Sequence, residues 1–215
     1  MCLSDHNLTS QIAIILAFAI IGGGLKYIDD AFDEDLFNKK IAVLIAPVIV
    51  IVACILAIKD TASQTILFSI LLSVLIGGKV DNLIFKVSSI AFLLLLLLPS
   101  FYLYGKVNFL LTPLIIITIM GIIDEKGNDY VDENKTNKLI HFFFEHRFSM
   151  KIGMLTVCVF QFLEPFYLFA FLGFDGAYES IRIFEYLYSY DKFQLQSEKV
   201  PIFKHRGLSP GSRKP

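Results

Sequence analysis

The chain has 215 residues, of which 55% are hydrophobic and only 18% are charged, and its formal net charge is −1. A soluble domain usually carries about 25% charged residues, and the charges missing here are missing in blocks. The net charge argues neither for nor against a nucleic-acid partner, but the lack of a basic, aromatic-rich stretch in a soluble segment argues against one. The apolar blocks leave little chain for a separate soluble domain.

Six apolar segments follow one another along the chain, each long enough to cross a hydrocarbon core as a helix of about 20 residues. They are Gln11–Ile28, Ile41–Ile58, Ala62–Gly78, Val87–Tyr104, Val107–Ile123 and Ile152–Phe174. Membrane β-strands would alternate in polarity, and these runs do not. The pattern predicts an all-α, polytopic integral membrane bundle of about six transmembrane helices, with five or seven crossings as alternatives.

The regions between and after these segments complete the predicted organisation. Residues 138–150 mix phenylalanines with charged residues, which indicates a helix lying at the membrane interface. Residues 1–190 form a single transmembrane domain in this interpretation. Residues 191–215 are polar and rich in Pro, Gly and Ser, which is typical of a disordered tail.

The basic residues predict the orientation. The loops after the first, third and fifth segments hold Lys26, Lys39, Lys40, Lys79, Lys86, Lys126, Lys135, Lys138, Arg147 and Lys151. The other two loops hold only Lys59 and Lys106. Cytoplasmic loops carry the excess of Lys and Arg, so this bias places the loops near 26–40, 79–86 and 124–151 in the cytoplasm and the N-terminus outside. Six crossings would put the basic C-terminal tail outside as well, which conflicts with the same rule.

Carboxylates follow glycines at the ends of the three odd-numbered segments. Asp29 and Asp30 end the first, Asp81 the third and Asp124 the fifth. A helix C-terminus carries a partial negative charge, so acids there need a cation or a proton. Close helix packing at the glycines would bring these acids together at one membrane face. Solvated loop acids are the alternative interpretation.

The first acidic group, Asp29-Asp30-Ala31-Phe32-Asp33, reads DDxxD. It resembles the aspartate-rich motif of isoprenoid-processing enzymes, and residues 128–132 (NDxxD) are similar to a second such motif. Membrane prenyltransferases of the UbiA type use two motifs of this kind on one face of a helical bundle. The resemblance implies Mg²⁺ held against a diphosphate. Neither motif here continues to the further aspartate of that family.

These features predict a Mg²⁺-dependent enzyme that acts on a lipid-linked phosphate or diphosphate at the cytoplasmic face. We assign the metal to Asp29, Asp33 and Asp124 and the catalytic roles to Asp30, Asp81 and Asp129. Lys26, Lys79, Lys126 and Glu164 are the candidate substrate-binding residues.

Two alternatives remain open at the level of sequence. Glu164 precedes a proline in the middle of the last predicted span, where an ionisable residue suggests an ion-coupled carrier. The second alternative is a non-catalytic membrane subunit, which would associate with a partner protein or with further copies of itself. Asp175, Glu179 and Arg182 follow that span at helical spacing and predict a local charge pair at an interface.

Overall fold

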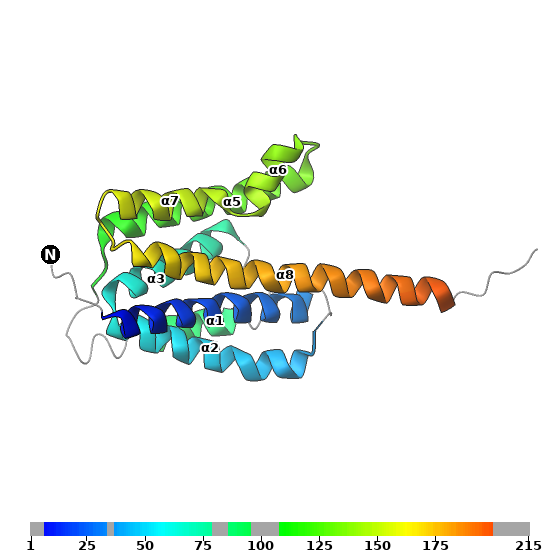
Figure 1. Ribbon diagram of the computed structural model, residues 1–215, viewed down its shortest axis with the longest axis horizontal. Coiled ribbons are helices and arrows are strands. Elements are labelled where there is room, and N and C mark those ends of the chain that lie inside the picture. Colours follow the sequence, from blue (N-terminus) through cyan, green and yellow to red (C-terminus); the bar gives the residue numbers. More distant parts are fainter. Residues whose placement is uncertain (1–6, 34–36, 79–85, 96–107, 200–215) are drawn as a thin grey trace, which may run out of the picture.

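The computed structural model describes residues 7–33, 37–78, 86–95 and 108–199, which form eight helices and no strand. They are α1 (Leu8–Asp33), α2 (Lys39–Lys59), α3 (Thr61–Gly77), the short helix Lys86–Leu95, α5 (Leu111–Glu133), α6 (Lys138–Glu145), α7 (Phe148–Val159) and α8 (Phe166–Lys199). The predicted all-α class is confirmed. The helices other than α6 lie roughly along one direction, and α8 extends well beyond its neighbours (Figure 1).

Two helices, Leu8–Phe32 and Lys39–Lys59, are long and apolar enough to cross a membrane. Three further apolar helices in the described part of the chain are shorter. Length and composition alone are weak evidence for a membrane protein, because a buried core helix or a signal sequence passes the same test.

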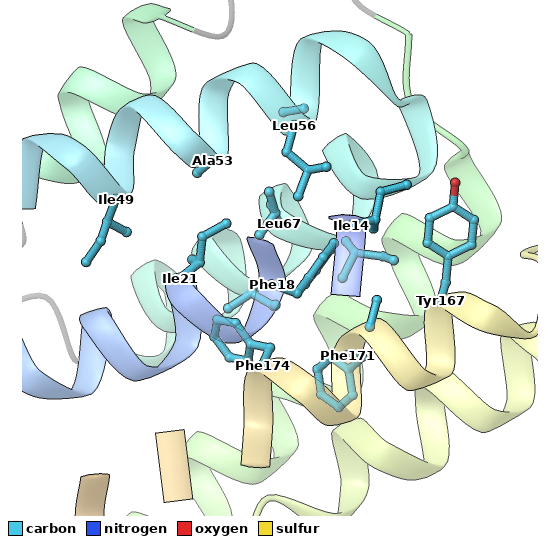
Figure 2. Packing of buried hydrophobic residues seen from close by; sticks show 14 of the residues in the cluster. Ile14, Phe18, Ile21, Ile49, Ala53, Leu56, Leu67, Tyr167, Phe171 and Phe174 are labelled. Atoms are coloured by element: carbon cyan, nitrogen blue, oxygen red, sulfur yellow. The ribbon is translucent and has the colours of Figure 1, made fainter. Parts of the chain in front are cut away.

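Helices α1 and α8 form the centre of the bundle. Their contacts run in parallel, because Gly173 lies against Ile15 while Ala177 and Ile181 lie against Gly23. A Cβ atom at Gly22 would lie 2.1 Å from the carbonyl oxygen of Phe174, so the two backbones touch there. Figure 2 shows the core that these helices share with α2 and α3, which includes Ile14, Phe18, Ile21, Ile49, Ala53, Leu56, Leu67, Phe171 and Phe174.

Helix α3 packs in parallel against α5 through small polar residues. Thr65, Ser69 and Ser73 are fully buried, and each hydroxyl donates to a carbonyl of its own helix. A Cβ atom at Gly121 would lie 2.5 Å from the Ser73 Cβ. Small side chains with self-satisfied hydroxyl groups allow helices to approach closely, as they do inside membranes.

One buried carboxylate ties the α2–α3 connection to α8. Asp60 accepts a hydrogen bond from the backbone N–H of Ser63 at 2.8 Å, which caps the N-terminus of α3. Its other oxygen accepts from the Tyr167 hydroxyl at 2.8 Å. The contact fixes the start of α8 against the α2–α3 connection.

The prediction of one continuous span over Ile152–Phe174 is wrong. Helix α7 ends at Val159, the chain reverses over residues 160–165, and α8 returns antiparallel to α7 (Figure 1). Gln161 has a left-handed backbone (φ 58°), and the N–H groups of Gln161 and Phe162 donate to the carbonyls of Cys158 and Val157 at 3.0 and 2.9 Å. This hydrogen-bond pair is a Schellman motif, which closes a helix C-terminus.

Two other predicted boundaries also shift. The predicted interfacial helix at 138–150 is divided, because α6 ends at Glu145 and α7 begins at Phe148. Helix α8 continues to Lys199, past residue 191 where the sequence places the start of the tail.

Candidate functional site

Four chain segments meet at the end of the bundle that carries α6. They are the C-terminal turns of α1 and α5, the α6–α7 connection and the middle of α8 (Figure 1). A polar cavity of about 170 Å³ lies between them. It is lined by Lys26, Asp124, Glu125, Asn128, Phe144, Glu145, Arg147, Tyr178 and Arg182. The cavity therefore combines three cationic side chains with three carboxylates in one small volume.

Arg147 lies at the junction of α6 and α7 and connects three helices. Its guanidinium carbon lies 4.6 Å from the centre of the Tyr178 ring, and an N–H group donates to the Tyr178 hydroxyl at 3.4 Å. The same group lies 3.3 Å from the carboxylate of Glu125, whose side chain is 7% exposed. Arg147 thus supplies both the cation–π contact and the ion pair that define the wall of the cavity.

The backbone of Arg147 is left-handed, with φ 50° and ψ 45°. A non-glycine residue pays a steric cost of about 1 kcal/mol or more in this conformation. The Arg147 N–H donates to the carbonyl of Phe144 at 3.1 Å, which closes α6. The same residue occupies the N-cap position of α7. One residue therefore ends one helix and begins the next while its side chain faces the cavity.

Lys26 is the cationic centre of a second group at the rim. Its ammonium lies 2.5 Å from Asp30, 3.6 Å from Asp29 and 3.7 Å from Glu185. It also lies 5.6 Å from the centre of the Tyr178 ring. Tyr178 therefore lies close to both Lys26 and Arg147, two cations that line the same cavity.

Asp30 is only 1% exposed. One oxygen pairs with Lys26, and the other has no hydrogen-bond partner among the described residues. Asp29, one residue earlier, is more accessible, with a side chain 33% exposed. The structure therefore places the first two of the three aspartates of the predicted motif beside the predicted substrate-binding Lys26.

Asp124, a predicted metal ligand, caps α7. Its two carboxylate oxygens accept from the backbone N–H groups of Ser149 at 3.0 Å and Met150 at 2.7 Å. Burial raises the pKa of Asp124, and the hydrogen bonds from Ser149 and Met150 oppose that shift. With both oxygens engaged, Asp124 fixes α7 to α5 and orients the Arg147 junction.

Arg182 joins α8 to the α6–α7 connection. It pairs with Glu179 at 2.6 Å, donates to the carbonyl of Glu145 at 3.0 Å, and lies 2.9 Å from Nδ1 of His146. The predicted local pair of Glu179 and Arg182 is confirmed. Asp175 pairs instead with Lys151 of α7 at 2.9 Å.

Lys126 and Asp129 lie on the last turns of α5, and neither lines the cavity. The Lys126 ammonium donates to the carbonyl of Gly77 at 3.1 Å, at the C-terminal end of α3, where a cation is favourable. Asp129 lies 3.9 Å from Lys126, and its side chain is 37% exposed. The ends of α3 and α5 are thus held together through Lys126, which the sequence assigned to substrate binding.

The remaining predicted residues lie elsewhere. Lys79 and Asp81 lie outside the described residues, and of Asp33 only the backbone is described. Among the side chains that the structure describes, no group of three or more His, Cys, Asp or Glu residues is arranged to hold a metal ion. Of the three predicted metal ligands, Asp29 lies beside Lys26, Asp124 caps α7, and the side chain of Asp33 lies outside the described part of the chain.

Glu164 lies in the connection between α7 and α8, at the opposite end of the bundle from α6 (Figure 1). It is half-buried, and its carbonyl accepts from the N–H of Tyr167 at 3.1 Å. It is therefore separated from the polar cavity by the length of α7.

Sequence reasoning did not assign Glu125, Arg147, Tyr178 or Arg182 to a site. The only available signal was the run of polar residues that follows Phe174 at helical spacing, because it shows that α8 remains polar on one face. The partners of these residues lie 22 to 37 positions away, and no local pattern encodes such pairs.

No family model, curated protein or solved structure matches this chain.

Proposed function

We propose that this chain is a multi-pass membrane protein whose polar cavity binds the phosphate head group of a membrane lipid or a lipid-linked intermediate. The single observation that carries the proposal is the cavity at one end of an otherwise apolar bundle, lined by Lys26, Arg147 and Arg182. Arginine forks match the geometry of phosphate oxygens and bind them bidentately.

The outer surface of the bundle supports the membrane location. Large apolar side chains are exposed at helical spacing, for example Ile115, Ile119 and Ile123 on α5, each more than 40% exposed. Similar rows follow α1 and α2, where Leu16 is 57% and Leu44 is 72% exposed. Contiguous apolar surface of this extent is unfavourable in water and favourable against lipid chains.

The direction of α8 supports a consistent orientation. Because α8 runs parallel to α1, its C-terminal end lies toward the end of the bundle where α1 and α5 deliver their charged residues. Lys192 and Lys199 of α8 therefore join the basic residues that the charge rule assigns to the cytoplasm. Six crossings would place the basic tail outside, against the charge rule. With the last predicted span divided into α7 and α8, the proposed orientation places the tail on the cytoplasmic side, in agreement with that rule.

An apolar pocket offers space for part of a lipid chain. It has a volume of about 110 Å³ and is lined mainly by α1, α2, α3 and the helix Lys86–Leu95. Leu25 lines this pocket, and the next residue, Lys26, lines the polar cavity. The last turns of α1 would thus have the head group on one side and hydrocarbon on the other.

The mixture of charges bears on the ligand. Glu125 and Glu145 also line the cavity, so a bound phosphate competes with them for the arginines. A divalent cation at Asp29 and Asp33 would offset that competition, and we retain Mg²⁺ and a phosphoryl or diphosphate transfer step as part of the proposal. A carrier centred on Glu164 has less support, because that residue lies in a helix connection far from the cavity.

The test uses the purified full chain and dioctanoyl phosphatidic acid as the probe, with and without Mg²⁺, in titration calorimetry. Arg147→Gln should weaken binding about tenfold or more, which corresponds to about 1.4 kcal/mol. Lys40→Gln, an exposed cation at the start of α2 that does not line the cavity, should leave affinity unchanged. Asp29→Asn should abolish any gain in affinity from Mg²⁺.

Arg147→Gln alone leaves the buried Glu125 carboxylate without its cation, which can cost stability. The double variant Arg147→Gln/Glu125→Gln removes both charges and separates folding from binding. If this folded variant binds the probe as tightly as the unmodified chain, the proposal is wrong.

A further inference from the structure

Helix α6 (Lys138–Glu145) has no buried residue, although five of its eight residues are leucine, isoleucine or phenylalanine. Leu139 is 72% exposed, Phe142 is 53% exposed and Ile140 is 44% exposed. An isolated helix of this length is unstable in water, so something other than its own propensity must hold it. Contacts with α5 and α7 hold α6 in place, but they leave Leu139 and much of Phe142 exposed.

The two faces of α6 differ in what they contact. Leu139, Phe142 and Phe143 follow one another at i, i+3 and i+4 and share one face. The other face carries His141, whose ring nitrogens lie 3.2 Å from Glu145 and 3.9 Å from Asp132 of α5. The polar face is thus engaged with α5. On the apolar face, the rings of Phe142 and Phe143 lie 5.7 and 5.6 Å from the ring of Phe148 on α7, but Leu139 and about half of Phe142 remain uncovered.

The cavity-facing residues of α6 fix its position on α5. Phe144 packs on the backbone of Gly127, where a Cβ atom would lie 2.2 Å from the ring. Phe144 and Glu145 line the polar cavity. A change in the position of α6 would therefore move part of the cavity wall.

Two features of the surroundings identify what covers the apolar face. Ile123 of α5 and Ile152 of α7, on the two helices that α6 contacts, are also apolar and exposed, and the proposed function assigns them to lipid. Lys135 and Lys138, at the start of α6, are exposed. A lysine near a membrane surface is attracted to the phosphates of anionic lipids.

We infer that α6 lies in the plane of the membrane surface, with Leu139 and Phe142 among the lipid acyl chains and Lys135 and Lys138 at the phosphate level. The helix holds the mouth of the polar cavity at the depth of lipid head groups through Phe144 and Glu145. This inference rests on the proposed membrane location and adds the surface by which the site meets its lipid.

The test measures the depth of nitroxide labels in the full chain, reconstituted in vesicles of phosphatidylcholine and phosphatidylglycerol. Single cysteines replace Leu139, Phe142, His141 and Val48 in a background without the native cysteines. His141 is the matched control, because it lies at the same level of the helix on the polar face. Val48, 53% exposed on α2, reports on the bundle itself.

The ratio of collision rates with oxygen and with a water-soluble nickel chelate should be several-fold higher at Leu139→Cys and Phe142→Cys than at His141→Cys. Equal ratios at the three positions, with Val48→Cys in lipid, overturn the α6 inference alone. Val48→Cys accessible to the nickel chelate overturns the membrane location itself. Spin–spin broadening at Leu139→Cys would show that a second copy covers this face, and the inference would fail.

Discussion

Arg147 and Asp124 illustrate how single residues organise the site. Asp124 uses both carboxylate oxygens to cap α7, and this cap sets the position at which Arg147 leaves α6. The left-handed backbone at Arg147 costs about 1 kcal/mol or more, which glycine would avoid. The contacts of the guanidinium with Glu125 and Tyr178, which glycine could not make, offset this backbone cost.

The role of Asp124 makes a residue-level prediction. Asp124→Ala removes the acceptor for two buried N–H groups at the start of α7 and should lower the free energy of unfolding by about 1–3 kcal/mol. Denaturant titration followed by circular dichroism measures this change. Asp132→Ala, at a carboxylate whose side chain is 57% exposed, is the control and should change stability by less than about 0.5 kcal/mol. Equal effects of the two substitutions would contradict the capping role.

Much of the residue-level chemistry was beyond sequence reasoning, for a physical reason. The acids at helix ends were visible because charges after apolar runs are conspicuous, and Asp29, Asp30 and Asp124 do lie beside Lys26 or the cavity. Backbone conformation at a non-glycine residue has no sequence signature. Arg147 therefore remained one basic residue among many.

At the scale of elements, apolar runs predicted helices well and the end of one helix poorly. The run Ile152–Phe174 contains no charge before Glu164, and a proline does not by itself end a helix, because Pro47 lies inside α2. The chain instead reverses through a Schellman motif at Gln161, a residue with no special turn preference. Tertiary packing of α8 on α1, which short-range patterns do not encode, favours this reversal.

The α1–α8 contact makes an element-level prediction. Gly22→Ala would place a Cβ atom 2.1 Å from the Phe174 carbonyl oxygen, so the helices must separate. The cost should be about 1–3 kcal/mol, as for overpacking in a close-packed interior. Gly176→Ala, on α8 with no neighbour within 4 Å of the new Cβ, should be neutral or stabilise by up to about 1 kcal/mol.

Thermal unfolding of the two alanine variants in the same detergent measures the difference. A Gly22→Ala protein as stable as Gly176→Ala would show that α1 and α8 do not meet at this glycine.

At the scale of the whole molecule, the helix directions gather charge at one end. Parallel packing of α3 on α5 and of α8 on α1 brings their charged turns together, while α7 returns antiparallel to α5. The sequence predicted that the odd-numbered segments deliver acids to a common face. It did not predict that α8 would add Tyr178, Arg182 and Glu185 to that face, because the reversal before α8 was missed.

The orientation of α8 relative to the membrane tests this arrangement most directly. Single cysteines at Lys135, Gln161 and Tyr186, introduced in sealed vesicles of known orientation, are labelled with a membrane-impermeant maleimide. Tyr186 is 74% exposed, and Gln161 is exposed in the α7–α8 connection. We expect Tyr186→Cys and Lys135→Cys to react from the same, cytoplasmic side and Gln161→Cys from the other. Reaction of Tyr186→Cys from the same side as Gln161→Cys would contradict the account.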